Sequence, residues 1–361
     1  MYIVIFVNTL AVLFSYLSKY NKFSYGFELA FFCLILFYGV RYNYGNDYIS
    51  YWQMFDEIAS YRSFVLFDDS VRIEPGWILL NKIFSGCGFP FLVFFLTIFQ
   101  FLSIYYFIKR FVPINKRYIA LFIYLFSFDL MLLELSMMRQ TIAIFLTMYA
   151  VVFLLNQKFI FFSIFALLAP MFHVSAWIIT PAYIILLFRF KVATNFQLSF
   201  LLVVLFLFLN IDSLNEIFVS LITSHLNTYA VYLDRGAAEL GSGLGLTFNL
   251  IIMLCILFTI NRQSAAIQFL YKWNLLAYIV LPFGFLIDLI ARVGFYFSFC
   301  SFLVYPFWFS SLTPKYLRQI VVSCCIFYIL YSFWLSLNHD IYAPYYSNYQ
   351  SIFLNENSLY K

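Results

Sequence analysis

Long uninterrupted runs of apolar residues constrain this chain more than any other feature. Runs such as 90–108, 139–155 and 317–337 approach the roughly 20 residues that a helix needs to cross a bilayer. Apolar residues make up 65% of the 361 positions, charged residues only 10%, and mean hydropathy is +0.91. A soluble domain carries about 25% charged residues. The chain is therefore expected to be a polytopic membrane protein.

Backbone chemistry favours helices for these crossings, because amide groups in hydrocarbon must bond within their own segment. The runs are continuous, whereas a membrane barrel alternates apolar and polar residues. The predicted fold is all-α, one transmembrane domain over residues 1–361 with about twelve helices. Residues 1–17 have neither a basic start nor a small-residue cleavage site, so they are predicted to be the first span. The predicted spans are 3–18, 26–40, 90–108, 118–134, 139–155, 159–172, 174–188, 197–210, 246–260, 270–290, 293–311 and 317–337.

Lysine and arginine positions then predict the orientation, because short cytoplasmic loops are enriched in both. One set of loops carries 13 of the 21 basic residues and is predicted to be cytoplasmic. Those residues are Lys19, Lys22, Lys109, Arg110, Lys116, Arg117, Lys158, Arg189, Lys191, Arg262, Lys272, Lys315 and Arg318.

The opposite side receives the other eight basic residues and nearly all of the acids. Fifteen of the 16 acidic residues fall there when Asp129 and Asp288 are assigned to their nearer outer ends, and Glu28 is the exception. Both chain ends are predicted to lie on this outer side. Such asymmetry indicates a polar site on the outer face of the membrane.

Two outer loops are long enough to hold structure, residues 41–90 and 211–245. The second contains GSGLG at 241–245, which lacks the lysine of a phosphate-binding loop and is predicted to be a hinge. The sequence has no convincing internal repeat, no Cys/His cluster at zinc spacing and no long basic run for nucleic acid. No cofactor or metal is predicted.

The first outer loop combines charge with aromatic rings. Arg41 ends the second predicted span, Gly45 permits a tight turn, and Asp47 follows. Rings beside a carboxylate suit sugars, whose apolar faces stack on aromatics while hydroxyls reach the acid. An interfacial aromatic belt is the alternative explanation for the rings. They are Tyr42, Tyr44, Tyr48, Tyr51 and Trp52.

Four further sites complete the set: Glu74 lies in the first outer loop, and the other three lie at predicted outer ends of spans. Glu74 precedes Pro75, which favours a helix start, so its carboxylate is expected at a helix N-terminus. Arg139 and Gln140 open the fifth predicted span, and an arginine at that depth indicates either function or snorkelling to the interface. The other two sites are His173 and Arg292 with Tyr296. Two apolar spans meet at His173 with almost no linker, which predicts a tight hairpin or a broken helix there. His173 is also the best acid/base candidate by residue type.

These segments carry a resemblance to a known family. RYNYGNDY, EPGW followed by ILLN, MRQTIAI, the His-Val-Ser-Ala step and the late Ala-Arg-Val-Gly-Phe-Tyr resemble the EpsG family of Wzy-type bacterial polysaccharide polymerases. The resemblance implies a C-type glycosyltransferase architecture in the inner membrane, with a periplasmic active site. It also implies undecaprenyl-pyrophosphate-linked oligosaccharides as donor and acceptor, without a nucleotide sugar. Polymer length is normally set by a separate regulator protein, and no segment marks a docking surface for one.

The chemistry that the resemblance implies predicts a role for each candidate residue. Arg41, Arg139 and Arg292 are predicted to bind the pyrophosphate, because guanidinium groups pair with phosphate oxygens in a bidentate way. Asp47, His173 and Glu74 compete as the base. The predicted substrate-binding set is completed by Gln140, Tyr44, Tyr48, Tyr296 and Arg235.

Six of these residues are expected to converge on one outer cavity open to lipid, namely Arg41, Asp47, Glu74, Arg139, His173 and Arg292. A ligase or single-sugar transferase would use nearly all of the same residues and is the main alternative. A flippase for lipid-linked oligosaccharides would spread charge through the bilayer, yet the inner halves of the spans have almost none.

Overall fold

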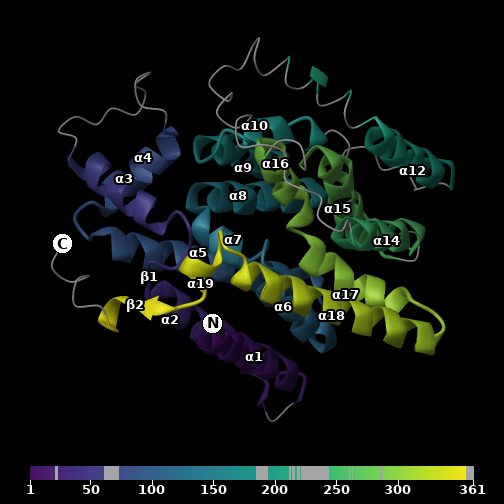
Figure 1. The fold of residues 1–361 in the computed structure, drawn as a ribbon, viewed down its shortest axis with the longest axis horizontal. Helices are drawn as coiled ribbons and strands as arrows, with labels where there is room; N and C mark the ends of the chain where they lie inside the picture. The colour runs from purple at the N-terminus through teal and green to yellow at the C-terminus, as the bar shows by residue number, and fades with distance from the viewer. Residues whose placement is uncertain are drawn as a thin grey trace. The chain divides into compact units, whose positions relative to one another are not determined.

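The structure is a computed structural model that describes residues 1–20, 23–60, 73–183, 194–210, 213, 216–217, 220, 244–259, 261, 263–284 and 288–354. It is helical, with a single two-stranded sheet within these residues. The chain divides into two compact units (Figure 1). The first comprises Met1–Ala150, Ile160–Val174 and Pro314–Lys361, and the second comprises Val151–Phe159 and Ser175–Thr313.

Helices α1 and α2 pack against α5 and α6 to form the core of the first unit. A buried hydrogen-bond chain joins three of them, since Tyr38 donates to Asn8 at 2.9 Å and Asn8 donates to the carbonyl of Leu125 at 3.1 Å. Such pairing satisfies polar groups that would be costly inside a membrane helix bundle. The elements are α1 (Tyr2–Leu17), α2 (Gly26–Gly39), α5 (Phe89–Phe111) and α6 (Arg117–Phe126).

The remaining elements that lie wholly or partly in the first unit comprise two long helices and several short helices and strands. They are β1 (Arg41–Tyr42), α3 (Tyr48–Ser60), α4 (Pro75–Phe84), η2 (Ile114–Lys116), α7 (Leu132–Ser136), α8 (Met138–Leu155), α9 (Phe159–Leu168), η3 (Ala169–Met171), α18 (Lys315–Asn338), α19 (Ala343–Tyr346), β2 (Gln350–Ser351) and η6 (Ile352–Leu354).

The C-terminal segment returns to the first loop. Strand β2 pairs antiparallel with β1, with Arg41 opposite Ser351, and β2 lies beside β1 in Figure 1. Tyr346 donates to the carbonyl of Leu132 at 2.8 Å, and the amide of Ile352 donates to the carbonyl of Val40 at 3.0 Å. The last helix and strand therefore fix the backbone of the candidate site.

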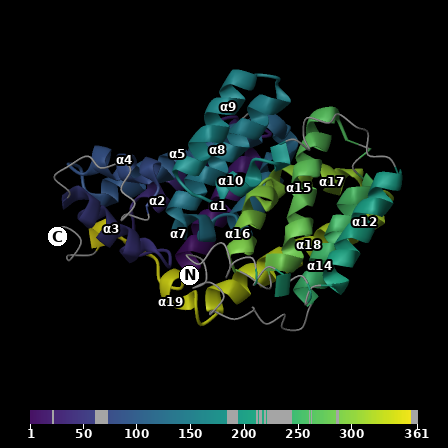
Figure 2. The same cartoon turned by 90° about the horizontal axis from the view of Figure 1, so that it is seen from above.

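In the second unit, α15 packs against α14, α16 and α17 (Figure 2). The indole of Trp273 donates to the carbonyl of Tyr296 at 2.9 Å and stacks on Tyr183, which ties α15 to α16. The elements are α10 (Ala176–Ile179), α12 (Thr194–Leu209), α14 (Leu244–Thr259), α15 (Ala265–Gly284), α16 (Asp288–Ser298) and α17 (Ser301–Ser311).

Three helices among the described residues are long and apolar enough to cross a membrane, namely α5, α8 and α18. Ile290–Ser298 and Ser301–Ser311, bent by 54°, would make a fourth span together. Four shorter apolar helices are Tyr2–Leu17, Gly26–Gly39, Phe159–Met171 and Phe248–Thr259. The helical membrane architecture is confirmed, whereas the count of twelve spans stays a prediction.

Two predicted spans differ from expectation within the described residues. The span predicted over 174–188 contains the four-residue helix Ala176–Ile179, followed by a turn at Thr180 and Pro181. The helix predicted over 118–134 ends at Phe126, where Ser127 adopts an extended backbone with ψ of 115°. Ser127 and Asp129 compete for backbone hydrogen bonds and disfavour a helix interior. The chain turns there and restarts as α7.

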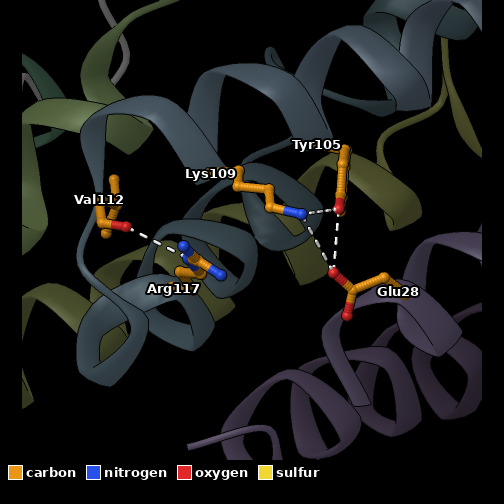
Figure 3. Close-up of polar contacts among 5 residues, drawn as sticks. All are labelled: Glu28, Tyr105, Lys109, Val112 and Arg117. Carbon is orange, nitrogen blue, oxygen red and sulfur yellow. Dashed lines mark hydrogen bonds and ion pairs between the residues drawn. The ribbon is translucent and has the colours of Figure 1, made fainter. Parts of the chain in front are cut away.

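One end of the α2–α5 pair carries a cluster of charged residues. At this end, Glu28 in the first turn of α2 accepts a hydrogen bond from Tyr105 at 2.9 Å and pairs with Lys109 at 3.4 Å (Figure 3). Arg117 lies nearby and donates to the carbonyl of Val112 at 3.3 Å. Because α5 has 23 residues, this basic end is roughly 35 Å along the helix from its start at Phe89.

Candidate functional site

Arg139 and Glu74 form an ion pair between the starts of two helices. Glu74 directly precedes α4, whose first residue is Pro75, so the predicted helix start is confirmed. Nη1 of Arg139 donates to Oε2 of Glu74 at 2.6 Å, and the two side chains are 23% and 16% exposed. A charge-assisted bond of this length in a half-buried setting holds the guanidinium in a defined position. Nε of Arg139 is buried and has no acceptor in the described part of the chain.

The second oxygen of Glu74 binds the turn that contains His173. The amide of Val174 donates to Oε1 of Glu74 at 3.3 Å. His173 is 9% exposed and follows η3, in agreement with the break predicted there. Glycine at position 76 permits this approach, because a Cβ there would lie 2.7 Å from the carbonyl oxygen of Met171.

Asp47 approaches the same helix start from the other side. Its amide donates to Oγ of Ser136 at 3.1 Å, three residues before Arg139. Gly45 has φ of +126°, a region that favours glycine, and a Cβ there would lie 3.2 Å from Cα of Ser136. The first loop therefore reaches the segment Leu132–Arg139 through Asp47 and through Glu74.

Arg41 is more deeply buried than the sequence alone suggests. It is 2% exposed, and its Nη1 donates to the carbonyl of Tyr38 at 2.9 Å and to Thr97 at 2.6 Å. Among the described residues, its Nε has no acceptor and no carboxylate pairs with it. Burial lowers the pKa of this guanidinium. The guanidinium of Arg41 thus lies between α2 and α5, where its two hydrogen bonds hold the start of the first loop.

Buried tyrosines surround Arg41. Tyr44 and Tyr48 are fully buried, and Tyr48 donates to the carbonyl of Arg41 at 3.1 Å. The ring of Tyr44 contacts those of Tyr346 and Tyr349, each with centroids 5.3 Å apart. Burial raises the pKa of Tyr44 and Tyr48, and that of Tyr349 to about 12. These hydroxyls stay protonated at physiological pH and leave the charge of Arg41 uncancelled.

The partly exposed rings of the first loop are different ones. Tyr42 and Trp52 are half-buried, with ring centroids 5.9 Å apart and an edge-to-face angle of 81°. Trp52 also rests on Phe89 at the start of α5. These two rings can offer a surface to a sugar in this conformation, whereas Tyr44 and Tyr48 cannot.

Sequence reasoning missed several residues of this region. Glu134 is 3% exposed and accepts hydrogen bonds from Tyr124 at 3.0 Å and from Gln100 at 3.3 Å. Its backbone carbonyl accepts from Thr141 at 2.7 Å, which ties α7 to α8. The C-terminal tyrosines were also missed. The signal for them is the density of tyrosines over 342–349.

The remaining predicted residues are placed separately. Gln140 follows Arg139 in α8 and is 1% exposed. Tyr296 lies in the second unit, where its hydroxyl is 2.9 Å from Oγ of Ser175, and Arg292 lies one turn earlier in α16. Arg235 falls outside the described residues. Of the six residues expected to converge, Glu74, Arg139, Asp47 and His173 are joined through the contacts above, Arg41 lies on the same loop, and the prediction for Arg292 stays open.

In the described part of the chain, no three His, Cys, Asp or Glu side chains are arranged to hold a metal ion. The groups that are present can hold an anion, through Arg139, and can accept a proton, through Asp47 or His173. That combination suits transfer of a group from a phosphate leaving group to a hydroxyl.

Apolar helices with a polar, arginine-containing site at their ends define a polytopic membrane protein. The sequence profile of the EpsG family matches residues 25–351, from one residue before α2 to the last residue of β2. The chain belongs to the EpsG family, a family of Wzy-like polysaccharide polymerases. Among curated proteins and among solved structures, none matches it significantly.

Proposed function

We propose that this protein polymerises undecaprenyl-pyrophosphate-linked oligosaccharide repeat units into O-antigen or a related surface polysaccharide, at the periplasmic face of the bacterial inner membrane. The observation that carries the proposal is the setting of Arg139. Its Nη1 is held by Glu74, its Nε is a buried donor without an acceptor in the described residues, and its side chain is 23% exposed. An unsatisfied buried donor costs about 1–3 kcal/mol, which an anionic ligand would recover.

Departure of a lipid pyrophosphate requires fixed positive charge. Negative charge grows on the phosphate oxygens as the glycosidic bond breaks, and a preorganised guanidinium stabilises it without reorganisation. Arg139 is suited to this role because its ion pair with Glu74 holds Nη1 in place while the side chain stays partly exposed. Arg292 is proposed as a further phosphate ligand, and Arg41 as the anchor of the loop that carries Asp47.

The acceptor hydroxyl must lose its proton as it attacks. Its oxygen forms a bond to the anomeric carbon of the donor glycan, and the bond from that carbon to the phosphate oxygen breaks. The hydroxyl proton passes to Asp47 or His173, and undecaprenyl pyrophosphate leaves with the bonding electrons. The backbone amide of Asp47 bonds to Ser136, three residues before Arg139, and the amide of Val174, next to His173, bonds to Glu74, the ion-pair partner of Arg139.

The predicted orientation supports a periplasmic site. The cluster of Glu28 and Lys109 lies where α2 begins and α5 ends, and Lys109, Arg110, Lys116 and Arg117 gather there. Asp47 follows the other end of α2, and Trp52 packs on Phe89, where α5 begins. By the positive-inside rule, the candidate site then faces the periplasm.

The decisive experiment is the product distribution. The gene is expressed in a bacterium that lacks its own polymerase but makes the matching lipid-linked repeat unit, and surface glycan is separated by size. A ladder of many lengths supports polymerisation. Single transferred units would instead identify a ligase or single-sugar transferase, and glycan that reaches the periplasm without any new linkage would identify a flippase.

A further inference from the structure

Glu74 was one of three candidates for the base, but both of its carboxylate oxygens already accept hydrogen bonds. Oε2 accepts from the guanidinium of Arg139 at 2.6 Å, and Oε1 accepts from the amide of Val174 at 3.3 Å. An ionised carboxylate has about four acceptor sites, and these two bonds use one on each oxygen. They make Glu74 a bridge between Arg139 and Val174, which are 35 positions apart in the sequence.

The residues after Glu74 reinforce this bridge. Pro75 fixes the start of α4 directly beside the carboxylate. Gly76 lets the backbone of α4 approach that of η3, because any Cβ there would meet the carbonyl of Met171 at 2.7 Å. The three residues Glu74, Pro75 and Gly76 therefore act together to hold the turn of His173 against α4.

We propose that Glu74 is a positioning residue that couples Arg139 to the turn of His173 and Val174. One carboxylate holds the guanidinium through Nη1 and also holds the backbone that carries a candidate base. The spacing between the phosphate ligand and the base is thus set by Glu74. The catalytic consequence rests on the proposed function, whereas the coupling itself is a property of the fold.

Three substitutions separate positioning from proton transfer. Glu74→Gln keeps an oxygen for one of the two donors, Glu74→Asp keeps the charge but shortens the reach, and Glu74→Ala removes both contacts. Asp56→Asn is the matched control, since Asp56 is an exposed acid on the same loop. Amide hydrogen exchange of the peptide spanning 169–176 is measured by mass spectrometry, together with polymer synthesis as a function of pH.

The proposal predicts that exchange over 169–176 accelerates about tenfold or more in Glu74→Ala, and less in Glu74→Gln, because a bond to a charged acceptor is lost or weakened. Exchange in α5 should stay unchanged, which reports an intact fold. Polymer synthesis should fall in the order wild type, Glu74→Gln, Glu74→Ala, with the same pH profile for wild type and Glu74→Gln.

Two results would overturn the proposal. One is unchanged exchange over 169–176 in Glu74→Ala, which would show that the bridge does not hold the turn. The other is a Glu74→Gln variant as inactive as Glu74→Ala with normal exchange, which would make Glu74 the base. If the wild type makes no polymer from a matched repeat unit while exchange responds as predicted, the proposed function fails and the coupling stands.

Discussion

At the start of α8, Arg139 donates to Glu74 through Nη1 while its Nε has no acceptor among the described residues. Its neighbours differ from those of Arg41, which donates to a carbonyl and a threonine hydroxyl inside the helix packing. Two arginines that the sequence ranks equally thus have different environments. Burial at Arg41 favours an anchoring role, and partial exposure at Arg139 favours ligand binding.

Asp47 and His173 can be distinguished as bases by substitution. Asp47→Asn keeps the backbone bond from residue 47 to Ser136, and His173→Ala keeps the backbone bond to Ala169, so both should fold normally. Removing the true base should lower the polymerisation rate by about 10²–10⁴-fold, while the other change should have a much smaller effect. Rates are compared at equal protein level. Long chains from both variants would exclude both residues from proton transfer.

Trp52 is predicted to contact the glycan. A stacked ring contributes about 1 kcal/mol, so Trp52→Ala should raise the apparent KM for the repeat unit about fivefold, and Trp52→Phe should raise it less. Tyr25→Ala is the control, since this exposed ring precedes α2 at the end of the helix near Glu28. Thermal unfolding of each variant checks the fold. Equal KM values for wild type and Trp52→Ala would remove Trp52 from the binding surface.

At the scale of elements, apolar runs and turn residues predicted where most helices lie, because both are local signals. Glu74 and Pro75 correctly mark the start of α4, and the break at His173 is confirmed. The early end of α6 was missed, since hydropathy averages over the polar residues that interrupt it.

Contacts between residues that lie far apart in the sequence could not be predicted from local signals. Tyr346 bonds to Leu132 across 214 positions, and no local pattern indicates that pairing. The same holds for Ser136, whose hydroxyl oxygen accepts a hydrogen bond from the backbone amide of Asp47. The sequence thus predicted candidate site residues, while the structure adds the residues that contact them.

The packing of α4 on η3 can be tested at Gly76, where the two backbones approach each other closely. Gly76→Ala places a methyl group 2.7 Å from the carbonyl oxygen of Met171 and should destabilise the protein by about 1–3 kcal/mol. Gly86→Ala is the matched control, because nothing lies within 4 Å of a Cβ there. Thermal unfolding in detergent compares the two variants. Equal midpoints for both would contradict the packing of α4 on η3.

At the scale of the whole molecule, α5 lies between two polar regions, and the proposed orientation predicts that they face opposite sides of the membrane. Cys87 is exposed just before α5, and Asn115 is exposed just after it. In spheroplasts, a membrane-impermeant maleimide should label wild-type Cys87 and should not label Asn115→Cys in a Cys87→Ser background. In inverted vesicles the result should be reversed. Labelling of both positions from one side would contradict the orientation.

Synthesis by the purified protein tests the central claim most directly. Wild type and Arg139→Lys are each incubated with a defined undecaprenyl-pyrophosphate-linked repeat unit, and products are separated by size. The account predicts a ladder from wild type and about 10²-fold or more reduction with lysine, because charge is kept while the fork of donors is lost. An equal ladder from Arg139→Lys, or no chain extension by folded wild-type protein, would contradict it.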